Sequence, residues 1–74
     1  MQVVVWSKNN CPYCDMAKKL LKQKGVDYEE RNINAGNWTK EDLLNANPLA
    51  RTMPQIFFGD ECIGGYNELV ARIG

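Results

Sequence analysis

The 74-residue sequence predicts an α/β fold in which one mixed sheet of four strands is flanked by three helices. Three features predict this class: short runs of β-branched and aromatic residues, stretches with apolar residues at helical spacing, and turn-forming residues between them. The elements follow in the order β-α-β-α-β-β-α. We expect a single domain over residues 1–74, because so short a chain has room for only one core.

The first half of the sequence predicts a strand, a helix and a second strand. Residues 2–6 are rich in valine and suit a strand buried on both faces. Pro12 is favoured at the first position of a helix, and helical spacing continues towards Gly25, so we expect a helix over 12–24. Residues 26–33 suit a less buried strand. The three elements form a βαβ unit, whose two strands should be parallel.

The second half begins with a predicted second helix. Thr39 suits its N-cap, and Trp38 and Leu43 have the spacing of a hydrophobic staple. Asn47 and Pro48 should end this helix.

A hairpin and a last helix complete the prediction. Residues 54–58 and 61–63 are the expected strands of the hairpin, with a tight turn at 59–60. The glycines at 64–65 interrupt the chain, and Asn67 is expected to cap a short third helix.

The charge and hydropathy of the chain exclude several classes of function. Nine basic residues balance nine acidic ones, which gives no electrostatic basis for nucleic-acid binding. No apolar stretch approaches the roughly 20 residues needed to span a bilayer. The N-terminal run has no basic region before it and no cleavage site of a signal peptide. We therefore expect a cytoplasmic protein that binds neither nucleic acid nor membrane.

Three cysteines and the absence of histidine narrow the chemistry. An odd, low count does not suit a secreted disulfide framework, and without histidine a Cys₂His₂ zinc site is excluded. Cys11 and Cys14 form a Cys-x-x-Cys pair, for which redox chemistry is favoured over zinc, since zinc needs four ligands. An iron–sulfur cluster shared between two chains stays open as a side activity. Cys62 is expected to be a small core or half-buried residue, with a regulatory thiol as the alternative.

Cys11 and Cys14 should differ in reactivity. Cys11 is expected at the N-cap of the first helix, where unpaired N–H groups and the helix dipole stabilise a thiolate. Together with Lys8, these should lower the pKa of the Cys11 thiol. Cys14 lies one turn further in, on the same face and within reach of a disulfide. Cys11 should therefore attack a substrate disulfide and Cys14 should resolve the resulting mixed disulfide.

Four segments together resemble the successive signatures of the dithiol glutaredoxins: Ser7-Lys8, Cys11-Pro12-Tyr13-Cys14, residues 51–57 and residues 63–66. Their order and spacing match over nearly the whole chain. The resemblance implies the thioredoxin-like fold in a minimal version. It also implies glutathione as co-substrate, with protein disulfides and glutathione mixed disulfides as substrates.

The resemblance further implies a glutathione site. Pro54 resembles the family's cis-proline, which leaves the backbone of Met53 free to pair with glutathione as with an added strand. Lys8 would bind the glycyl carboxylate, and Tyr13 would cover the sulfur. The full set implied is Lys8, Tyr13, Arg51, Thr52, Met53, Pro54, Gln55, Gly65, Tyr66 and Asn67, with no metal.

The implied partners are glutathione, disulfide-containing proteins such as ribonucleotide reductase and, indirectly, glutathione reductase, and we expect a monomer. Two alternatives remain. One is a dedicated electron donor, for example to ribonucleotide reductase, recharged by thioredoxin reductase. The other is an iron–sulfur carrier in which Cys11 and glutathione ligate a cluster between two chains.

Overall fold

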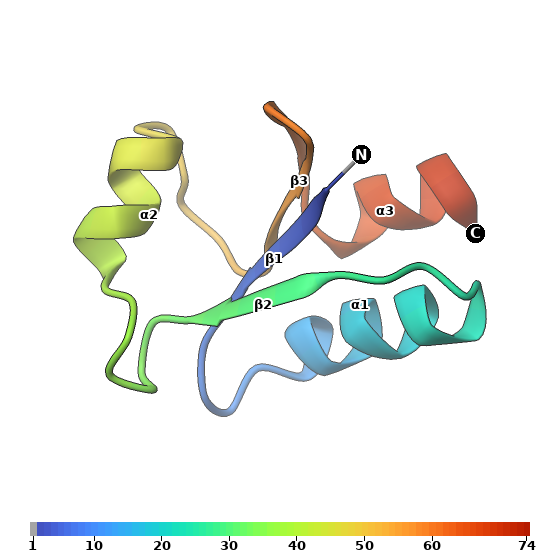
Figure 1. Ribbon diagram of the computed structural model, residues 1–74, viewed down its shortest axis with the longest axis horizontal. Helices are drawn as coiled ribbons and strands as arrows, with labels where there is room; N and C mark the ends of the chain where they lie inside the picture. The colour runs from blue at the N-terminus through green and yellow to red at the C-terminus, as the bar shows by residue number, and fades with distance from the viewer. Residues whose placement is uncertain (1) are drawn as a thin grey trace.

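The computed structural model describes residues 2–74 and places helices on both faces of one four-stranded sheet (Figure 1). Its elements are β1 (Val3–Ser7), α1 (Pro12–Gln23), β2 (Glu29–Asn32), α2 (Lys40–Ala46), β3 (Gln55–Phe58), β4 (Glu61–Gly64) and α3 (Tyr66–Ile73). The predicted order of elements and the predicted four-stranded mixed sheet are both confirmed.

The strands lie in the order β2-β1-β3-β4. β1 pairs with β2 in parallel, as the βαβ pattern predicted, and with β3 in antiparallel. β2 is shorter than expected and begins at Glu29 instead of residue 26. The reason lies at the end of α1, where the N–H of Val26 donates to the carbonyl of Leu21 over 2.9 Å. That N–H closes the helix end and is not available to a strand ladder.

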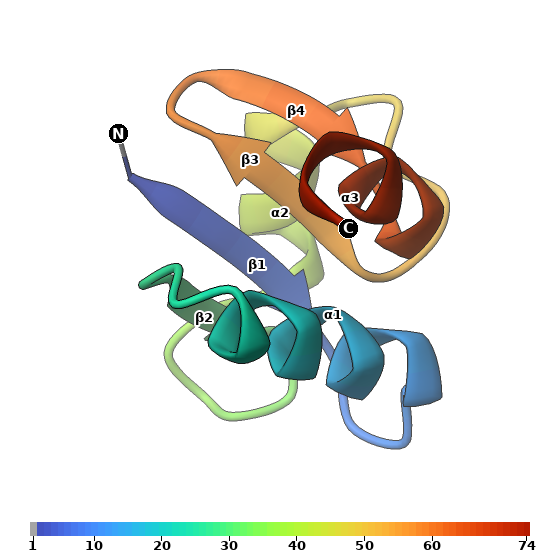
Figure 2. The same ribbon diagram turned by 90° about the vertical axis from the view of Figure 1, so that its right-hand side faces the viewer.

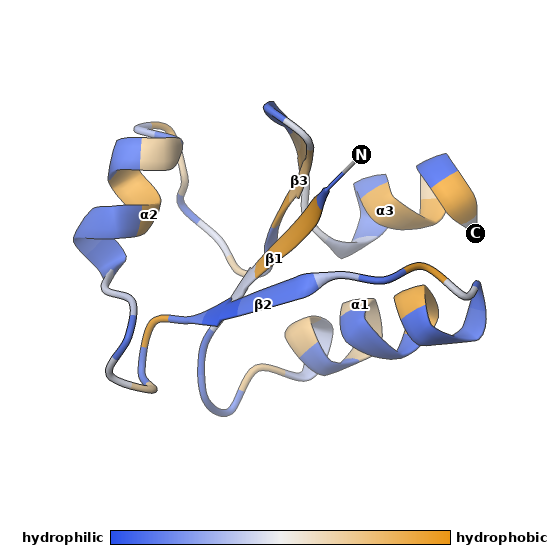
Figure 3. Ribbon diagram, in the orientation of Figure 1, coloured by the Kyte–Doolittle hydropathy of each residue, from blue (hydrophilic) through white to orange (hydrophobic). Residues whose placement is uncertain are grey.

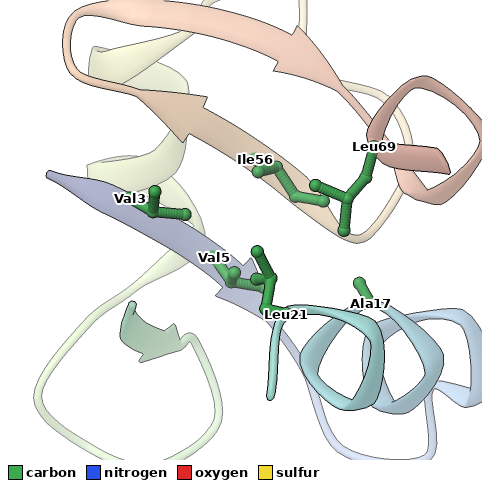
Figure 4. Close-up of a cluster of buried hydrophobic side chains, with 6 residues drawn as sticks. All are labelled: Val3, Val5, Ala17, Leu21, Ile56 and Leu69. Carbon is green, nitrogen blue, oxygen red and sulfur yellow. The ribbon is translucent and has the colours of Figure 1, made fainter. Parts of the chain in front are cut away.

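The side chains of β1 alternate between two cores. Val3 and Val5 face α1 and α3, where they pack with Ala17, Leu21, Ile56 and Leu69 (Figure 4). Val4 and Trp6 face the other side, where α2 covers the sheet (Figures 1 and 2). Because all five residues of β1 are buried, this strand is the centre of the molecule. Figure 3 shows the contrast between apolar β1 and polar β2, which lies at the edge of the sheet.

The core under α2 is largely aromatic. The rings of Trp6 and Trp38 meet edge to face with centroids 5.4 Å apart, and the Arg31 guanidinium lies 4.3 Å from the Trp38 ring. Leu43 and Trp38 pack in the same cluster, as the staple spacing predicted. These contacts hold α2 and the segment before it against the sheet.

The caps of α2 are as predicted, but the cap of α3 is not. Thr39 is the N-cap of α2, with a capping box to Asp42, and Asn47 is its C-cap. The prediction that Asn67 caps α3 is wrong, because α3 begins at Tyr66 with Gly65 as its N-cap. The carboxylate of Glu68 accepts the Gly65 N–H, which is the half of a capping box that needs no side chain on the N-cap residue.

Within residues 2–74 no helix is both long enough and apolar enough to cross a membrane.

Candidate active site

Three chain segments meet at one end of the sheet (Figure 2). β1 ends there at Ser7, and β3 begins there at Gln55 because it runs antiparallel to β1. β4 runs back to the same end, where Gly64 lies opposite Ile56. The Cys-x-x-Cys segment, the loop before β3 and the start of α3 therefore lie close together, although they are far apart in the sequence.

Cys11 is the N-cap of α1, as predicted. Its backbone is extended, and the N–H of Cys14 donates to its Sγ over 3.2 Å. Cys11 and Cys14 form a disulfide, with their Cα atoms 5.2 Å apart. The helix start thus directs a backbone donor at the first sulfur and holds the second sulfur beside it.

The two cysteines differ in exposure in the predicted direction. Cys11 is 7% exposed and Cys14 is completely buried. A sulfur of a large substrate can therefore approach only Cys11. This difference agrees with the predicted division into an attacking and a resolving thiol, and those roles themselves stay a prediction.

A groove of about 280 Å³ reaches the Cys-x-x-Cys segment at Tyr13, and we call it the sulfur-side groove. It is lined by Tyr13, Thr52, Met53, Pro54, Gly65, Tyr66, Asn67 and Glu68. All but Glu68 belong to the predicted glutathione set, so the structure brings most of that set together. The Met53–Pro54 bond is cis, as the resemblance implied.

Two aromatic rings stand at this groove. The rings of Tyr13 and Tyr66 are tilted by 34° with centroids 6.0 Å apart. Tyr13 is 58% exposed, so most of its ring is open to a ligand. The pair links the first turn of α1 to the first turn of α3 across the groove.

Glu68 is the groove residue that the sequence analysis did not assign to the site. Its Oε1 accepts the N–H of Gly65 over 2.7 Å. Its side chain lies against Gly64, where a Cβ would come within 2.7 Å of the Glu68 Cγ. The signal that could have found it is the acidic residue three positions after a helix N-cap, which is the spacing of a capping box.

Lys8 and Arg51 lie apart from this groove. They line a second groove of about 380 Å³, which reaches α2 and which we call the cationic groove. The two grooves share Thr52 and Met53. Nine of the ten predicted glutathione residues, all but Gln55, therefore line two adjoining grooves that meet at the loop before the cis-proline.

Gln55 lies within the fold, with only 7% of the residue exposed. Its Nε2 donates to the carbonyl of Thr52 over 2.7 Å, and its Oε1 lies 3.3 Å from the Asn47 Nδ2 and 3.4 Å from the Cys62 Sγ. These bonds fix the loop that carries Thr52. A contact between Gln55 and glutathione stays a prediction. Cys62 is half-buried in this network, as expected.

An ion pair anchors α1 to the sheet at the same end of the molecule. Glu30 accepts hydrogen bonds from the Ser7 Oγ over 2.7 Å and from the Lys18 Nζ over 2.8 Å. The bond from Lys18, followed by the one from Ser7, lowers the pKa of the Glu30 carboxyl. The same bond to Glu30 raises the pKa of Lys18. Because Ser7 is the last residue of β1, this network fixes the start of the loop that leads to Cys11.

Among residues 2–74, no three histidine, cysteine or carboxylate side chains lie close enough together to hold a metal ion. The Cys11–Cys14 disulfide is the reactive feature that the structure shows at this end of the sheet.

Comparison with known proteins gives the family. The family model for glutaredoxin matches residues 3–63. Glutaredoxin 3 of Escherichia coli K12 is 41% identical over 69 residues, which cover 93% of this chain and 82% of that protein.

Solved structures agree with the family match. A buckwheat glutaredoxin–glutathione complex superposes with a TM-score of 0.80 at 32% identity, over 95% of this chain and 66% of that one. Reduced Escherichia coli glutaredoxin gives a TM-score of 0.72 at 38% identity, over 99% and 93%. The fold is thus the thioredoxin-like fold of the glutaredoxins. The chain belongs to the glutaredoxin family, as a redox protein of the dithiol type with its Cys-x-x-Cys pair at Cys11 and Cys14.

Proposed function

We propose that the chain is a glutathione-dependent thiol–disulfide oxidoreductase that reduces protein disulfides and glutathione mixed disulfides. The observation that carries the proposal is the sulfur-side groove, whose lining contains seven residues of the predicted glutathione set. A glutathione complex of a similar protein, buckwheat glutaredoxin, supports it.

The reaction begins at Cys11, the less buried of the two cysteines. The Cys11 thiolate attacks one sulfur of a protein disulfide, which forms a mixed disulfide and releases the other sulfur as a thiolate. Cys14 then gives up its proton, attacks the Cys11 sulfur and releases the second substrate thiolate. The substrate has gained two electrons, and Cys11 and Cys14 are joined in the disulfide that the structure contains.

Two glutathione molecules restore the dithiol. The first attacks the Cys11 sulfur, which forms a glutathione mixed disulfide and frees the Cys14 thiol. The second attacks the glutathione sulfur, releases the Cys11 thiolate and leaves as oxidised glutathione. A glutathione mixed disulfide of a protein enters this cycle directly when Cys11 attacks its glutathione sulfur, and Cys14 is then not needed.

Glutathione is a small peptide with a carboxylate at each end, and the groove suits such a ligand. Its cysteine backbone would pair with the main chain of Met53, as in strand addition. Its γ-glutamyl end would lie at the start of α3, between Gly65 and Asn67. Its glycyl end would lie towards Lys8 and Arg51, where the two grooves join at Thr52.

The partners follow from this activity. They are disulfide-containing proteins, of which ribonucleotide reductase is one candidate, and glutathione reductase acts indirectly by regenerating glutathione. The proposed location is the cytoplasm, where glutathione keeps thiols reduced. The protein would act there as a monomer, since one chain supplies both cysteines and the whole groove.

The test is turnover of a small glutathione mixed disulfide, coupled to NADPH oxidation through glutathione reductase. A parallel reaction replaces glutathione and its reductase with thioredoxin reductase. We expect turnover with glutathione. Turnover with thioredoxin reductase alone would contradict glutathione dependence and identify a dedicated electron donor instead. A brown protein with visible absorbance after anaerobic purification would favour a cluster carrier.

A further inference from the structure

The cationic groove contains more charge and more apolar surface than the glycyl end of glutathione, placed at Lys8 and Arg51 above, would occupy. It lies between α2, the end of β2 and the loop before the cis-proline, and holds about 380 Å³. Its lining consists of three cations and an apolar floor: Lys8, Lys40 and Arg51, then Ile33, Leu43, Leu44, Ala50 and Met53, with Thr52 at the junction to the sulfur-side groove.

The three cations are not neutralised within the fold. The ion pairs formed within residues 2–74 use Lys18, Arg31 and Arg72 as their cations. Lys8, Lys40 and Arg51 come from three different segments, and all three are exposed. Among residues 2–74 no acidic side chain lines the groove. One glycyl carboxylate leaves the groove with an excess of positive charge, so it also attracts a larger anionic ligand.

The floor of the groove is apolar and extends away from the cysteines. Leu43 is buried, and Leu44 and Ile33 are half-buried, so their side chains still offer apolar surface to a ligand. Glutathione has carboxylates at its ends but no aliphatic side chain to cover this floor. A longer peptide that carries an acidic residue next to an aliphatic one satisfies both features.

The position of the cationic groove indicates that this peptide is part of a protein substrate. Thr52 and Met53 line both grooves, so the cationic groove continues directly from the sulfur-side groove. We propose that the cationic groove docks the segment beside the target cysteine of a protein substrate, and that this segment carries an acidic residue next to an aliphatic one. This inference rests on the proposed function and adds the class of protein substrate that the enzyme prefers.

The test uses three peptides cyclised through the same Cys-Gly-Gly-Cys disulfide. Their flanking sequences are Asp-Leu-Asp, Asp-Ser-Asp and Lys-Leu-Lys, and reduction by the full chain is followed with excess glutathione. We expect kcat/KM for Asp-Leu-Asp to exceed that for Lys-Leu-Lys by about fivefold or more, because exposed charge pairs are worth roughly this factor. The preference should shrink in about 0.5 M salt, where exposed charges are screened. Asp-Ser-Asp should fall between the two.

Two variants and a matched control locate the effect. Lys40→Glu reverses a groove charge at the first position of α2, where a carboxylate is compatible with the helix. It should remove the preference for acidic flanks, and Leu44→Ala should remove the advantage of leucine over serine. Lys24→Glu makes the same charge change on the exposed end of α1, outside the groove, and should leave the preference intact.

Turnover of the small glutathione mixed disulfide is measured in parallel for every variant. If it proceeds normally while all three peptides are reduced at equal rates, the docking proposal is wrong and the proposed function stands. If glutathione turnover fails in the wild type, the proposed function is wrong. Docking is then tested separately by the fluorescence anisotropy of labelled peptides that carry serine in place of cysteine. Equal affinities of the protein for all three peptides would overturn the docking proposal.

Sedimentation at the assay concentration tests whether a second copy of the chain occupies the cationic groove. We expect one species with the mass of a single chain. A dimer that Lys40→Glu dissociates would mean that a second copy covers the groove, and it would overturn the proposal.

Discussion

The backbone N–H of Cys14 donates a hydrogen bond to the Sγ of Cys11 over 3.2 Å, so Cys14 holds the sulfur of the N-cap cysteine through its main chain. This bond exists because Cys11 is the N-cap of α1 and Cys14 is the third residue of the helix. A thiolate at Cys11 can accept the same bond. The side chain of Cys14 is free for a separate task, which leads to different expectations for the two cysteines.

Cys11→Ser should abolish reduction of every disulfide substrate, because each proposed cycle begins with attack by the Cys11 thiolate. Cys14→Ser should keep reduction of glutathione mixed disulfides, since its backbone N–H is unchanged and glutathione can complete that cycle. It should lose much of its activity on protein disulfides, where an internal thiol must release the substrate. The measurement compares both substrates in both variants. Equal loss in the two variants would show that the division of roles is wrong.

Cys62→Ser should have nearly wild-type activity on both substrates. The Cys62 Sγ lies 3.4 Å from the Gln55 Oε1 and 3.5 Å from the Asn47 Nδ2, on the side of the sheet that α2 covers. A serine hydroxyl can donate and accept in the same positions. Turnover and the midpoint of urea unfolding are the readouts, and we expect a stability change below about 1 kcal/mol. A large loss of turnover in a folded variant would give Cys62 a redox role.

Elements with a strong local signal were predictable from the sequence. The valine-rich run became β1, proline and helical spacing placed α1 within one residue of its expected end, and Thr39 capped α2. Cys11 at the N-cap followed from the position of Pro12. Each of these depends on neighbouring residues, so no tertiary information was needed.

Features that depend on contacts across the fold were not predictable in the same way. The start of β2 moved because Val26 bonds to the end of α1. The cap of α3 moved from Asn67 to Gly65 because the Glu68 carboxylate occupies the Gly65 N–H. Lys8 and Arg51 line the cationic groove and Tyr13 lines the sulfur-side groove, and the two grooves meet at Thr52 and Met53. Sequence order alone does not specify these spatial relationships.

Glu30→Gln should reduce stability at neutral pH, because the carboxylate accepts bonds from Ser7 and Lys18. The pKa of Glu30 is lowered in the folded state, so its contribution is complete above its usual value of about 4.5 and is lost as the pH falls through the folded pKa. The pKa of Lys18 is raised, so its contribution is present below about 10.5 and is lost as the pH rises through the folded value.

The unfolding free energies of Glu30→Gln and the wild type should therefore differ most between about pH 5 and pH 10, by roughly 0.5–1 kcal/mol, since the pair is partly exposed. They should converge at lower pH. Urea titrations from pH 3 to pH 9 measure this difference. Glu61→Gln is the control, because the Glu61–Arg72 pair is more exposed and should contribute less. A constant difference down to pH 3 would contradict the role of the Glu30 charge.

Gly64→Ala should destabilise the protein and disturb the sulfur-side groove. Gly64 has φ of 113°, a conformation that alanine adopts at a cost of about 1–3 kcal/mol. The added Cβ would also lie 2.7 Å from the Glu68 Cγ and displace the carboxylate that caps α3.

Gly25→Ala is the matched control, since its φ of 69° is also positive but nothing lies within 4 Å of its Cβ. Glu68→Ala removes the colliding side chain, so in the double variant the cost of Gly64→Ala should fall to the backbone cost of its φ of 113° alone. Urea unfolding of all four variants gives the coupling free energy between positions 64 and 68. If the unfolding free energies lost in Gly64→Ala and Glu68→Ala simply add in the double variant, the Glu68 side chain is not the reason for a glycine at position 64.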